Sequence, residues 1–115
     1  MKIAVAGAHG KSTTSAMIGT FLHDLRAQGT TITGTLVKAF NARNISAEGQ
    51  NIMNIEACEY RNAFLKYTPD IAVVTNIDPD HLDFFKTEAA YTEAFHVFAR
   101  SAKCLVMLAD EAEKK

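Results

Sequence analysis

The 115-residue sequence contains two cysteines, two prolines and no tryptophan. Two cysteines are too few for a structural zinc site, and no Cys-x-x-Cys pair occurs, which excludes the common zinc and redox motifs. Cys58 and Cys104 stand in apolar stretches of the sequence. We therefore expect two reduced thiols in the core of a cytoplasmic protein, and no disulfide framework.

The sequence also lacks an excess of either charge and lacks any long hydrophobic run. Its formal net charge is -1, from 12 basic and 13 acidic side chains, which gives no reason to expect nucleic acid or an anionic membrane as a partner. No segment approaches the ~20 apolar residues that a membrane span needs. His9 and Lys11 interrupt the first apolar run, so we expect no signal peptide. The length fits a single domain.

A glycine-rich motif lies between an apolar run and an amphipathic run near the start of the chain. Residues 3–6 predict a buried strand, and residues 15–25 predict a helix. Gly7 and Gly10 lie between them and allow a tight turn whose backbone N–H groups point inward, directly before the helix N-terminus. Unpaired N–H donors at the positive end of a helix dipole favour the binding of phosphate. The motif therefore predicts a loop that binds the phosphates of a nucleotide.

The residues that follow the second glycine strengthen this interpretation. Lys11 would add a positive charge for the β- and γ-phosphates, and the hydroxyl of Ser12 or Thr13 could ligate Mg²⁺. The common Walker spacing places a further glycine six residues before the lysine, where this sequence has Val5. A glycine-rich strand-to-helix turn without a ligand is therefore the alternative interpretation.

Apolar strands alternate with helical segments along the rest of the chain. We expect strands over residues 2–6, 30–37, 52–55, 71–75 and 104–108. We expect helices over residues 11–28, with Gly29 as C-cap, and over 88–102, with helical turns over 61–67. Residues 38–50 and 76–86 are expected to be loops, and a charged tail ends the chain. This alternation predicts an α/β fold, a P-loop-type parallel sheet flanked by helices.

Three polar clusters follow strands of this predicted sheet. The phosphate loop follows the first strand, Glu56 follows the third, and the block Asp78-Pro-Asp-His-Leu-Asp83 follows the fourth. Ligands of parallel sheets bind at the carboxyl ends of the strands, which all lie at the same end of the sheet. We therefore expect the three clusters to come together in space.

The residue types in these clusters suit a magnesium site beside phosphates. Mg²⁺ takes oxygen ligands and usually binds one or two protein groups together with substrate phosphates and water. Ser12 and Glu56 could supply two such oxygens. Either Asp78 or Asp80 could supply a third, and His81 could bind a second cation or contact a transferring phosphoryl group. The alternatives are a solvated acidic loop that caps a helix, a strand-end carboxylate in solvent and a surface histidine.

Other candidate residues have structural explanations. His9, inside the loop, either touches phosphate or merely fills the loop. No basic residues interleave with the phenylalanines, so we expect core packing and not a platform for stacking bases. This set comprises Phe64, Phe84, Phe85, Phe95 and Phe98.

The glycine-rich run Gly7-Ala-His-Gly-Lys-Ser-Thr13 resembles the shortened phosphate loop of the Mur ligases, the ATP-dependent amide-forming enzymes of peptidoglycan synthesis. The resemblance runs over nearly all of the chain, from Ile3 to about Leu108, and extends through four further blocks, of which the Asp-His-Leu-Asp run after Thr-Asn-Ile is highly specific. They are Val37-Lys38, Asn41-Ala-Arg43, Glu56-Ala-Cys-Glu-Tyr-Arg61 and the segment from Pro69 to Asp83. The last two blocks are most similar to the branch that joins L-alanine to UDP-N-acetylmuramate.

The resemblance implies a two-step reaction. ATP would phosphorylate the carboxylate of UDP-N-acetylmuramate to an acyl phosphate, and the amine of L-alanine would displace phosphate to form the amide. The implied cofactors are ATP and Mg²⁺, and neither nucleic acid nor a membrane is an implied partner.

The resemblance also implies roles for individual residues. The ATP phosphates would be held by Gly7, Ala8, His9, Gly10, Lys11, Ser12 and Thr13. Lys11 would contact the γ-phosphate, and Ser12 and Glu56 would bind the first Mg²⁺. His81 would stand near a second Mg²⁺ and the acyl phosphate, with Asp80 supporting it.

The sequence departs from the Mur ligase pattern in several places. Some members place a carbamylated lysine fifteen residues after the histidine, where this chain has His96, so we expect no carbamyl-lysine. Cys58 stands where many members have aspartate. Residues 1–115 match only the first part of the central ATP-binding domain. The N-terminal UDP-sugar domain, the C-terminal amino-acid domain and the adenine-binding segment are absent, so we do not expect this chain to catalyse ligation alone.

Three other functions remain as alternatives. A nucleotide-binding switch such as a small GTPase would need an Asn-Lys-x-Asp motif, and the nearest match, Thr75-Asn-Ile-Asp78, lacks the lysine. A Mur ligase that recycles murein tripeptide shares the Glu-Ala-x-Glu-Tyr pattern. A folded, non-catalytic nucleotide-binding remnant is the third.

Overall fold

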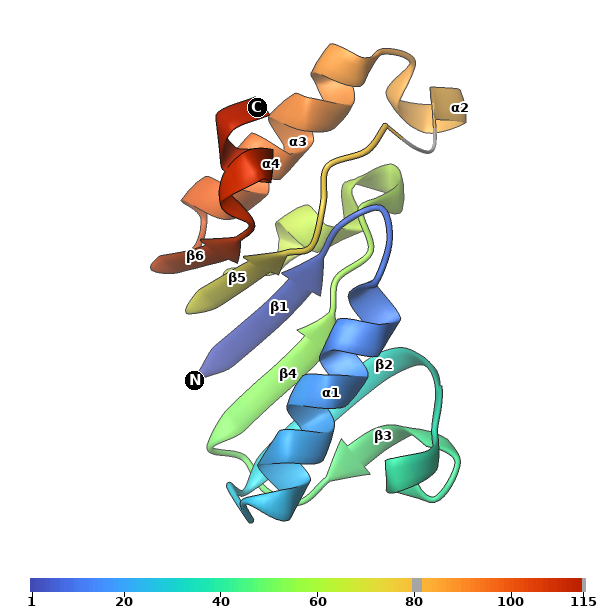
Figure 1. The fold of residues 1–115 in the computed structure, drawn as a ribbon, viewed down its shortest axis with the longest axis vertical. Coiled ribbons are helices and arrows are strands. Elements are labelled where there is room, and N and C mark those ends of the chain that lie inside the picture. The colour runs from blue at the N-terminus through green and yellow to red at the C-terminus, as the bar shows by residue number, and fades with distance from the viewer. Residues whose placement is uncertain (80–81, 115) are drawn as a thin grey trace.

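The computed structural model describes residues 1–79 and 82–114, and these residues form one six-stranded sheet with helices packed on it. The strands are β1 (Lys2–Ala6), β2 (Gly29–Val37), β3 (Arg43–Ala47), β4 (Ile52–Glu56), β5 (Ile71–Val74) and β6 (Cys104–Met107). The helices are α1 (Lys11–Asp24), α2 (Leu82–Phe85), α3 (Glu88–Arg100) and α4 (Ala109–Lys114), with 3₁₀ segments η1 (Lys38–Phe40) and η2 (Tyr60–Lys66). Figure 1 shows the arrangement.

The sheet has the strand order β3-β2-β4-β1-β5-β6. Every neighbouring pair is parallel except β2 and β3, which run antiparallel. The strand before the glycine-rich loop, β1, lies in the middle, between β4 and β5. The predicted α/β fold with a parallel sheet flanked by helices is therefore confirmed, with the antiparallel β3 at one edge as an addition that the sequence did not predict.

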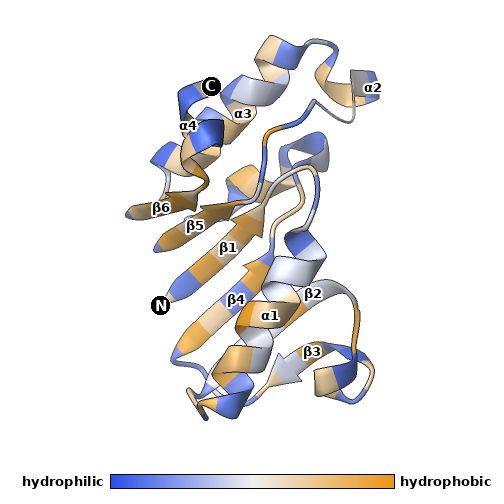
Figure 2. Ribbon diagram, in the orientation of Figure 1, coloured by the Kyte–Doolittle hydropathy of each residue, from blue (hydrophilic) through white to orange (hydrophobic). Residues whose placement is uncertain are grey.

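One face of the sheet packs against η2 and α3. Ala4 of β1 lies beside Ala72 of β5, and these small side chains leave room for aromatic rings. Phe64 stacks on Phe98 with ring centroids 4.9 Å apart, and Phe95 meets Phe64 edge-on at 5.1 Å. Figure 2 shows the apolar colouring of β1 and β5 in this region. Of the five phenylalanines expected in the core, four are buried and Phe84 is 38% exposed.

The opposite face packs against α1, through smaller and more polar side chains. Gly19 lies so close to β2 that an added Cβ would be 2.7 Å from a methyl group of Thr31. Asn54 of β4 is fully buried and donates a hydrogen bond to the carbonyl oxygen of Ser15, at 2.9 Å. These contacts hold α1 across β2 and β4, directly behind the loop that follows β1 (Figure 1).

The expected loop over 38–50 is wrong, because residues 43–47 form β3. This strand pairs antiparallel with β2, and four of its five residues are exposed. A strand that is exposed on both faces has no alternating apolar pattern, so the sequence around it does not indicate its pairing with β2. The short turn before it ends at Asn41 and Ala42, which have φ values of 55° and 56°.

The first helix is shorter than expected, and two short helices lie in predicted non-helical segments. Helix α1 ends at Asp24, because Arg26 and Gln28 adopt positive φ and turn the chain into β2. Residues 82–85 form α2 inside the segment expected as a loop, and residues 109–114 of the tail form α4. Helix α3 ends at Arg100, close to the expected end.

The expectation that both cysteines lie in the core is wrong. Cys58 lies exposed in the turn after β4, and Cys104 lies exposed on β6, which is the strand at one edge of the sheet. Neither thiol is in the core. Among the described residues, none of the helices has the length and apolar character needed to cross a bilayer.

Candidate functional site

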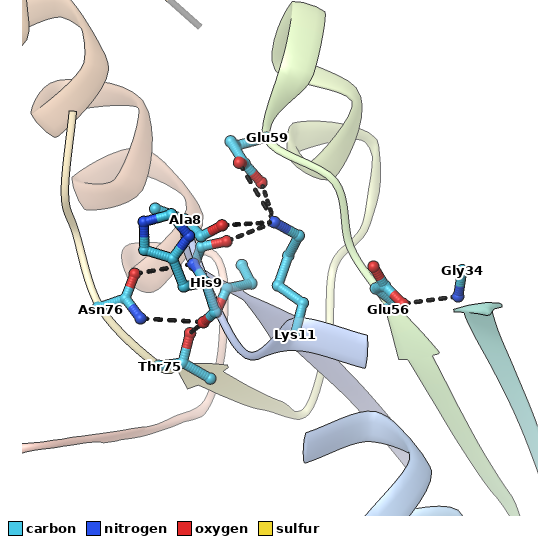
Figure 3. Close-up of polar contacts among 10 residues, drawn as sticks. Ala8, His9, Lys11, Gly34, Glu56, Glu59, Thr75 and Asn76 are labelled. Atoms are coloured by element: carbon cyan, nitrogen blue, oxygen red, sulfur yellow. Dashed lines mark hydrogen bonds and ion pairs between the residues drawn. The ribbon is translucent and has the colours of Figure 1, made fainter. Parts of the chain in front are cut away.

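The segments that follow β1, β4 and β5 meet at the carboxyl end of the parallel strands, because these three strands are neighbours in the sheet. Figure 3 shows the residues concerned, which come from the loop after β1, the turn after β4 and the end of β5. The predicted convergence is present for the loop and Glu56, which line one hollow, and the end of β5 reaches the loop through Thr75 and Asn76. Asp78 is exposed on the segment that leaves β5, whereas Asp80 and His81 lie outside the described residues.

Both glycines of the loop adopt positive φ. Gly7 has a φ of 139°, and a Cβ there would lie 2.0 Å from the hydroxyl oxygen of Thr75. Gly10 has a φ of 80° and is the N-cap of α1, with no side-chain hydrogen bond to the helix and open space around its Cα. The loop therefore turns tightly against β5 and leaves the first N–H groups of α1 without a side-chain cap.

The end of β5 holds the tip of the loop through the backbone of His9. The amide of Asn76 accepts a hydrogen bond from the His9 N–H at 3.0 Å and donates one to the His9 carbonyl at 2.9 Å. The hydroxyl of Thr75 donates to the same carbonyl at 2.5 Å. Sequence reasoning gave these two residues no role at the loop, although their position at the end of a strand was the available signal. They fix the loop before any ligand arrives.

The ammonium group of Lys11 points back toward the loop and toward the turn after β4. It donates to the carbonyl oxygen of Gly7 at 2.6 Å and lies 3.4 Å from that of Ala8. Glu59 places its two carboxylate oxygens 3.3 and 3.2 Å from the same nitrogen (Figure 3). The Glu59 side chain is fully buried and that of Lys11 is 14% exposed. The sequence motif that contains Glu59 does not indicate this ion pair, because the pair depends on how the turn after β4 folds against the loop.

The carboxylate of Glu56 is held by β2. It accepts a hydrogen bond from the backbone N–H of Gly34 at 2.6 Å (Figure 3). A Cβ at Gly34 would come within 2.9 Å of the carboxylate, so the absence of a side chain makes this contact possible. The carboxylate is thereby oriented at the end of β4.

The loop and Glu56 line one hollow of about 350 Å³. Its lining residues are Ala8, His9, Gly10, Lys11, Ser12, Thr13 and Glu56. Thus the hollow brings together backbone N–H donors, a hydroxyl group of Ser12 and a carboxylate. The described residues contain no group of three histidine, cysteine, aspartate or glutamate side chains that could hold a metal alone. A hydroxyl and a carboxylate fit Mg²⁺, which takes its remaining oxygens from phosphates and water.

A larger hollow of about 570 Å³ begins at Ser12 and runs along α1, beside the end of β2. Its walls include the exposed side chains of Met17, Phe21 and Leu36. These apolar groups do not suit an anion, so the smaller hollow at the loop is the candidate phosphate site.

Comparison with known families and structures agrees with this geometry. The family model of the Mur ligase middle domain matches residues 5–115. Among curated proteins, the UDP-N-acetylmuramate–L-alanine ligase of Borreliella burgdorferi is 39% identical over 101 residues, which are 88% of this chain and 22% of that protein. The ligase of the same name from Flavobacterium johnsoniae is 43% identical over 96 residues, 84% of this chain and 21% of that protein. The chain thus spans about a fifth of the length of these relatives.

Two solved structures share the fold. The crystal structure of UDP-N-acetylmuramate–alanine ligase, MurC, from Thermotoga maritima matches with a TM-score of 0.86 at 27% identity, over 96% of this chain and 26% of that one. The MurF ligase of Thermotoga maritima, solved in complex with ADP, matches with a TM-score of 0.77 at 23% identity, over 98% of this chain and 29% of that one. The MurF match concerns the fold alone. Together with the match over residues 5–115, these findings show that the chain belongs to the Mur ligase middle domain family.

Proposed function

We propose that this chain is part of the central, ATP-binding domain of a peptidoglycan-precursor ligase, and that it binds the phosphates of ATP together with Mg²⁺. The complete enzyme would join L-alanine to UDP-N-acetylmuramate. An N-terminal domain for the UDP-sugar and a C-terminal domain for the amino acid would complete it. The names of the relatives that match over most of this chain support the choice of substrates.

The observation that carries the proposal is the meeting of the glycine-rich loop, Lys11 and Glu56 around one hollow. Backbone N–H groups at the start of α1 would bind phosphate oxygens, helped by the positive end of the helix dipole. Lys11 would turn toward the β- and γ-phosphates. The hydroxyl of Ser12 and the carboxylate of Glu56 would hold Mg²⁺, which neutralises charge on the phosphates as the γ-phosphoryl group transfers.

The proposed reaction has two steps, phosphoryl transfer to a carboxylate and then amide formation. A carboxylate oxygen of UDP-N-acetylmuramate attacks the γ-phosphorus of ATP, and ADP leaves with the electrons of the broken bond. The amine of L-alanine then attacks the acyl carbon, inorganic phosphate leaves, and the nitrogen loses a proton. The loop residues of this chain orient the γ-phosphoryl group for the first step. A role for His81 beside the acyl phosphate, with support from Asp80, stays a prediction from their position in the motif.

A ligase that recycles murein peptide is a second candidate, because the block Glu56-Ala-Cys-Glu-Tyr60 is shared with that branch. A nucleotide-binding remnant without catalysis is a third candidate. All three share the proposed phosphate site, so they are distinguished by the substrate and not by ATP binding.

Thermal unfolding with and without Mg·ATP tests the phosphate site. At a hundredfold excess over its dissociation constant, the ligand is expected to stabilise the chain by about 2.7 kcal/mol, which is a rise of roughly ten degrees in the midpoint. Lys11→Ala should remove most of this ligand-induced rise, and Glu56→Gln should remove the part that depends on Mg²⁺. A rise of equal size in Lys11→Ala would show that the nucleotide binds elsewhere.

A further inference from the structure

Glu59 is a buried carboxylate that the proposed mechanism does not use. It lies three residues after Glu56, at the start of η2, and its side chain is fully buried. Charged side chains are almost never buried to this degree unless they are paired. Glu59 forms an ion pair with Lys11, the residue that would contact the nucleotide phosphates.

The contacts of Lys11 show what a phosphate would have to replace. An ammonium group has three N–H donors. In this structure the donors face the backbone oxygens of Gly7 and Ala8 and the carboxylate of Glu59. A phosphate oxygen can therefore bind the ammonium only by drawing it away from acceptors that already hold it.

The formal charges around the hollow also oppose an anion. Lys11 contributes +1, and Glu56 and Glu59 contribute −1 each, so these three side chains sum to −1. Water screens a buried carboxylate poorly, so the negative charge of Glu59 acts on the phosphates with little loss. When a divalent cation binds in the hollow, the formal charge of the three side chains and the cation together becomes +1.

We propose that Glu59 makes nucleotide binding by this chain conditional on the divalent cation, because it neutralises Lys11 until the metal arrives with the phosphates. This inference rests on the proposed function of the loop and adds a positioning residue to it. Free ATP then meets a site without net positive charge, whereas Mg·ATP arrives with a bound cation that offsets the two carboxylates and frees Lys11 to contact the phosphates. The consequence is discrimination against nucleotide that lacks its metal.

The test is a comparison of ATP affinity in EDTA and in excess Mg²⁺, for the wild-type chain and for Glu59→Gln. The wild-type chain should bind far more weakly in EDTA. Glu59→Gln should improve the affinity in EDTA by about tenfold or more while changing the affinity in Mg²⁺ by less than about threefold. Glu59→Asp keeps the charge and should keep the dependence on Mg²⁺. Urea unfolding of each variant establishes that it is folded.

Glu93→Gln is the matched control, because it removes one carboxylate that is 61% exposed on α3 and is paired with His96 and Arg100. It should leave the ratio of the two affinities unchanged. Suppose that ATP binding needs Lys11 but Glu59→Gln leaves the ratio of the affinities in Mg²⁺ and in EDTA unchanged. This result would overturn the inference about Glu59 and leave the proposed function standing. Binding that does not depend on Lys11 contradicts the proposed function itself.

A second measurement needs no nucleotide. Limited acylation with acetic anhydride, read by mass spectrometry against the other lysines of the chain, reports how firmly the Lys11 ammonium is held. Glu59→Gln should raise the relative labelling of Lys11 several-fold. If no variant binds ATP in either condition, unchanged labelling overturns the role of Glu59, and increased labelling supports its hold on Lys11.

Discussion

Two lysine–carboxylate pairs lie at opposite ends of the sheet, and they differ in burial more than in distance. At the carboxyl end, Lys11 and Glu59 are 3.2 Å apart, with side chains 14% and 0% exposed. At the amino end, Lys103 and Asp70 are 2.7 Å apart, with side chains 83% and 27% exposed. The shorter contact is the more exposed one. Water screens it and both side chains can move, so its contribution to stability is small.

The two pairs also serve different neighbours. Asp70 lies just before β5, and it accepts the backbone N–H of Lys2 as well as the Lys103 ammonium. It therefore ties together the starts of β1, β5 and β6. Lys11 and Glu59 instead join the glycine-rich loop to the turn after β4. The pair at the amino end is exposed to water and contributes little to stability, whereas the buried pair at the carboxyl end also sets the charge of the candidate site.

The largest expected effect at the carboxyl end comes from Gly7→Ala. Its φ of 139° is unfavourable for alanine, and the added Cβ would lie 2.0 Å from the Thr75 hydroxyl oxygen. We expect a loss of about 4 kcal/mol in the free energy of unfolding, from backbone strain and overpacking together. Gly10→Ala is the control, because it has positive φ and open space, and it should cost only about 1 kcal/mol. Urea denaturation measures both, and equal losses would contradict the close fit against β5.

The ion pairs themselves can be broken one at a time. Lys11→Met leaves the buried Glu59 carboxylate without the ammonium and should destabilise the chain by about 3 kcal/mol. Lys103→Met should leave the unfolding midpoint unchanged within error, because that lysine is exposed. The double variant Lys11→Met with Glu59→Gln should recover part of the loss. If Lys11→Met and Lys103→Met were equally stable, burial would not explain a difference in how much the two ion pairs contribute to stability.

A smaller effect is expected where β5 holds the loop. Asn76→Ala removes two hydrogen bonds to the His9 backbone and should cost about 1–2 kcal/mol of stability, with weaker binding of Mg·ATP. Asn51→Ala, near the amino end, removes one exposed side-chain hydrogen bond at 3.2 Å and should stay within about 0.5 kcal/mol. Thermal unfolding and nucleotide titration of both variants give the comparison. A larger loss in Asn51→Ala would reverse the assigned difference between the two ends.

The smallest effect concerns pH at the amino end. The hydrogen bond from Lys103, and then that from the Lys2 backbone, hold the pKa of Asp70 below its ordinary value of 3.8. A lowered folded-state pKa stabilises the fold above the unfolded-state pKa, and this stabilisation is lost as the pH falls through the folded-state pKa. Asp70→Asn should therefore melt slightly below the wild-type chain at pH 7, and the gap should close below about pH 4. A gap that widened in acid would contradict this sign.

The strands of the sheet could be predicted because their apolar runs are short and clearly bounded. Residues 52–55, 71–75 and 104–108 differ from the observed β4, β5 and β6 by a single residue at one end. The rule that ligands bind at the carboxyl ends of parallel strands then placed Glu56 beside the loop. Local pattern and one topological rule were sufficient for this part of the candidate site.

Other features depend on contacts that no local pattern reports. The pairing of β3 with β2 is a tertiary contact of an exposed strand, and Arg26 and Gln28 end α1 through positive φ. The role of Glu59 follows from its burial against Lys11, from which it is separated in the sequence by 48 residues that include the strands β2, β3 and β4. The amide of Asn76 likewise meets His9 only because β5 lies beside β1. The apolar residues next to Cys104 in the sequence predict a core position, but Cys104 is exposed because β6 lies at the edge of the sheet.

The central place of β1 has a consequence for the time course of folding. Its partners are distant in sequence: Lys2 lies opposite Met53 of β4, and Ile3 lies opposite Ile71 of β5. Contacts between such distant segments close long loops and form slowly. The loop after β1 is therefore held in place only once Thr75 and Asn76, at the end of β5, lie beside it. In a refolding experiment, α1 should therefore form early, as measured by its helical circular dichroism. Nucleotide binding should appear only in the last kinetic phase.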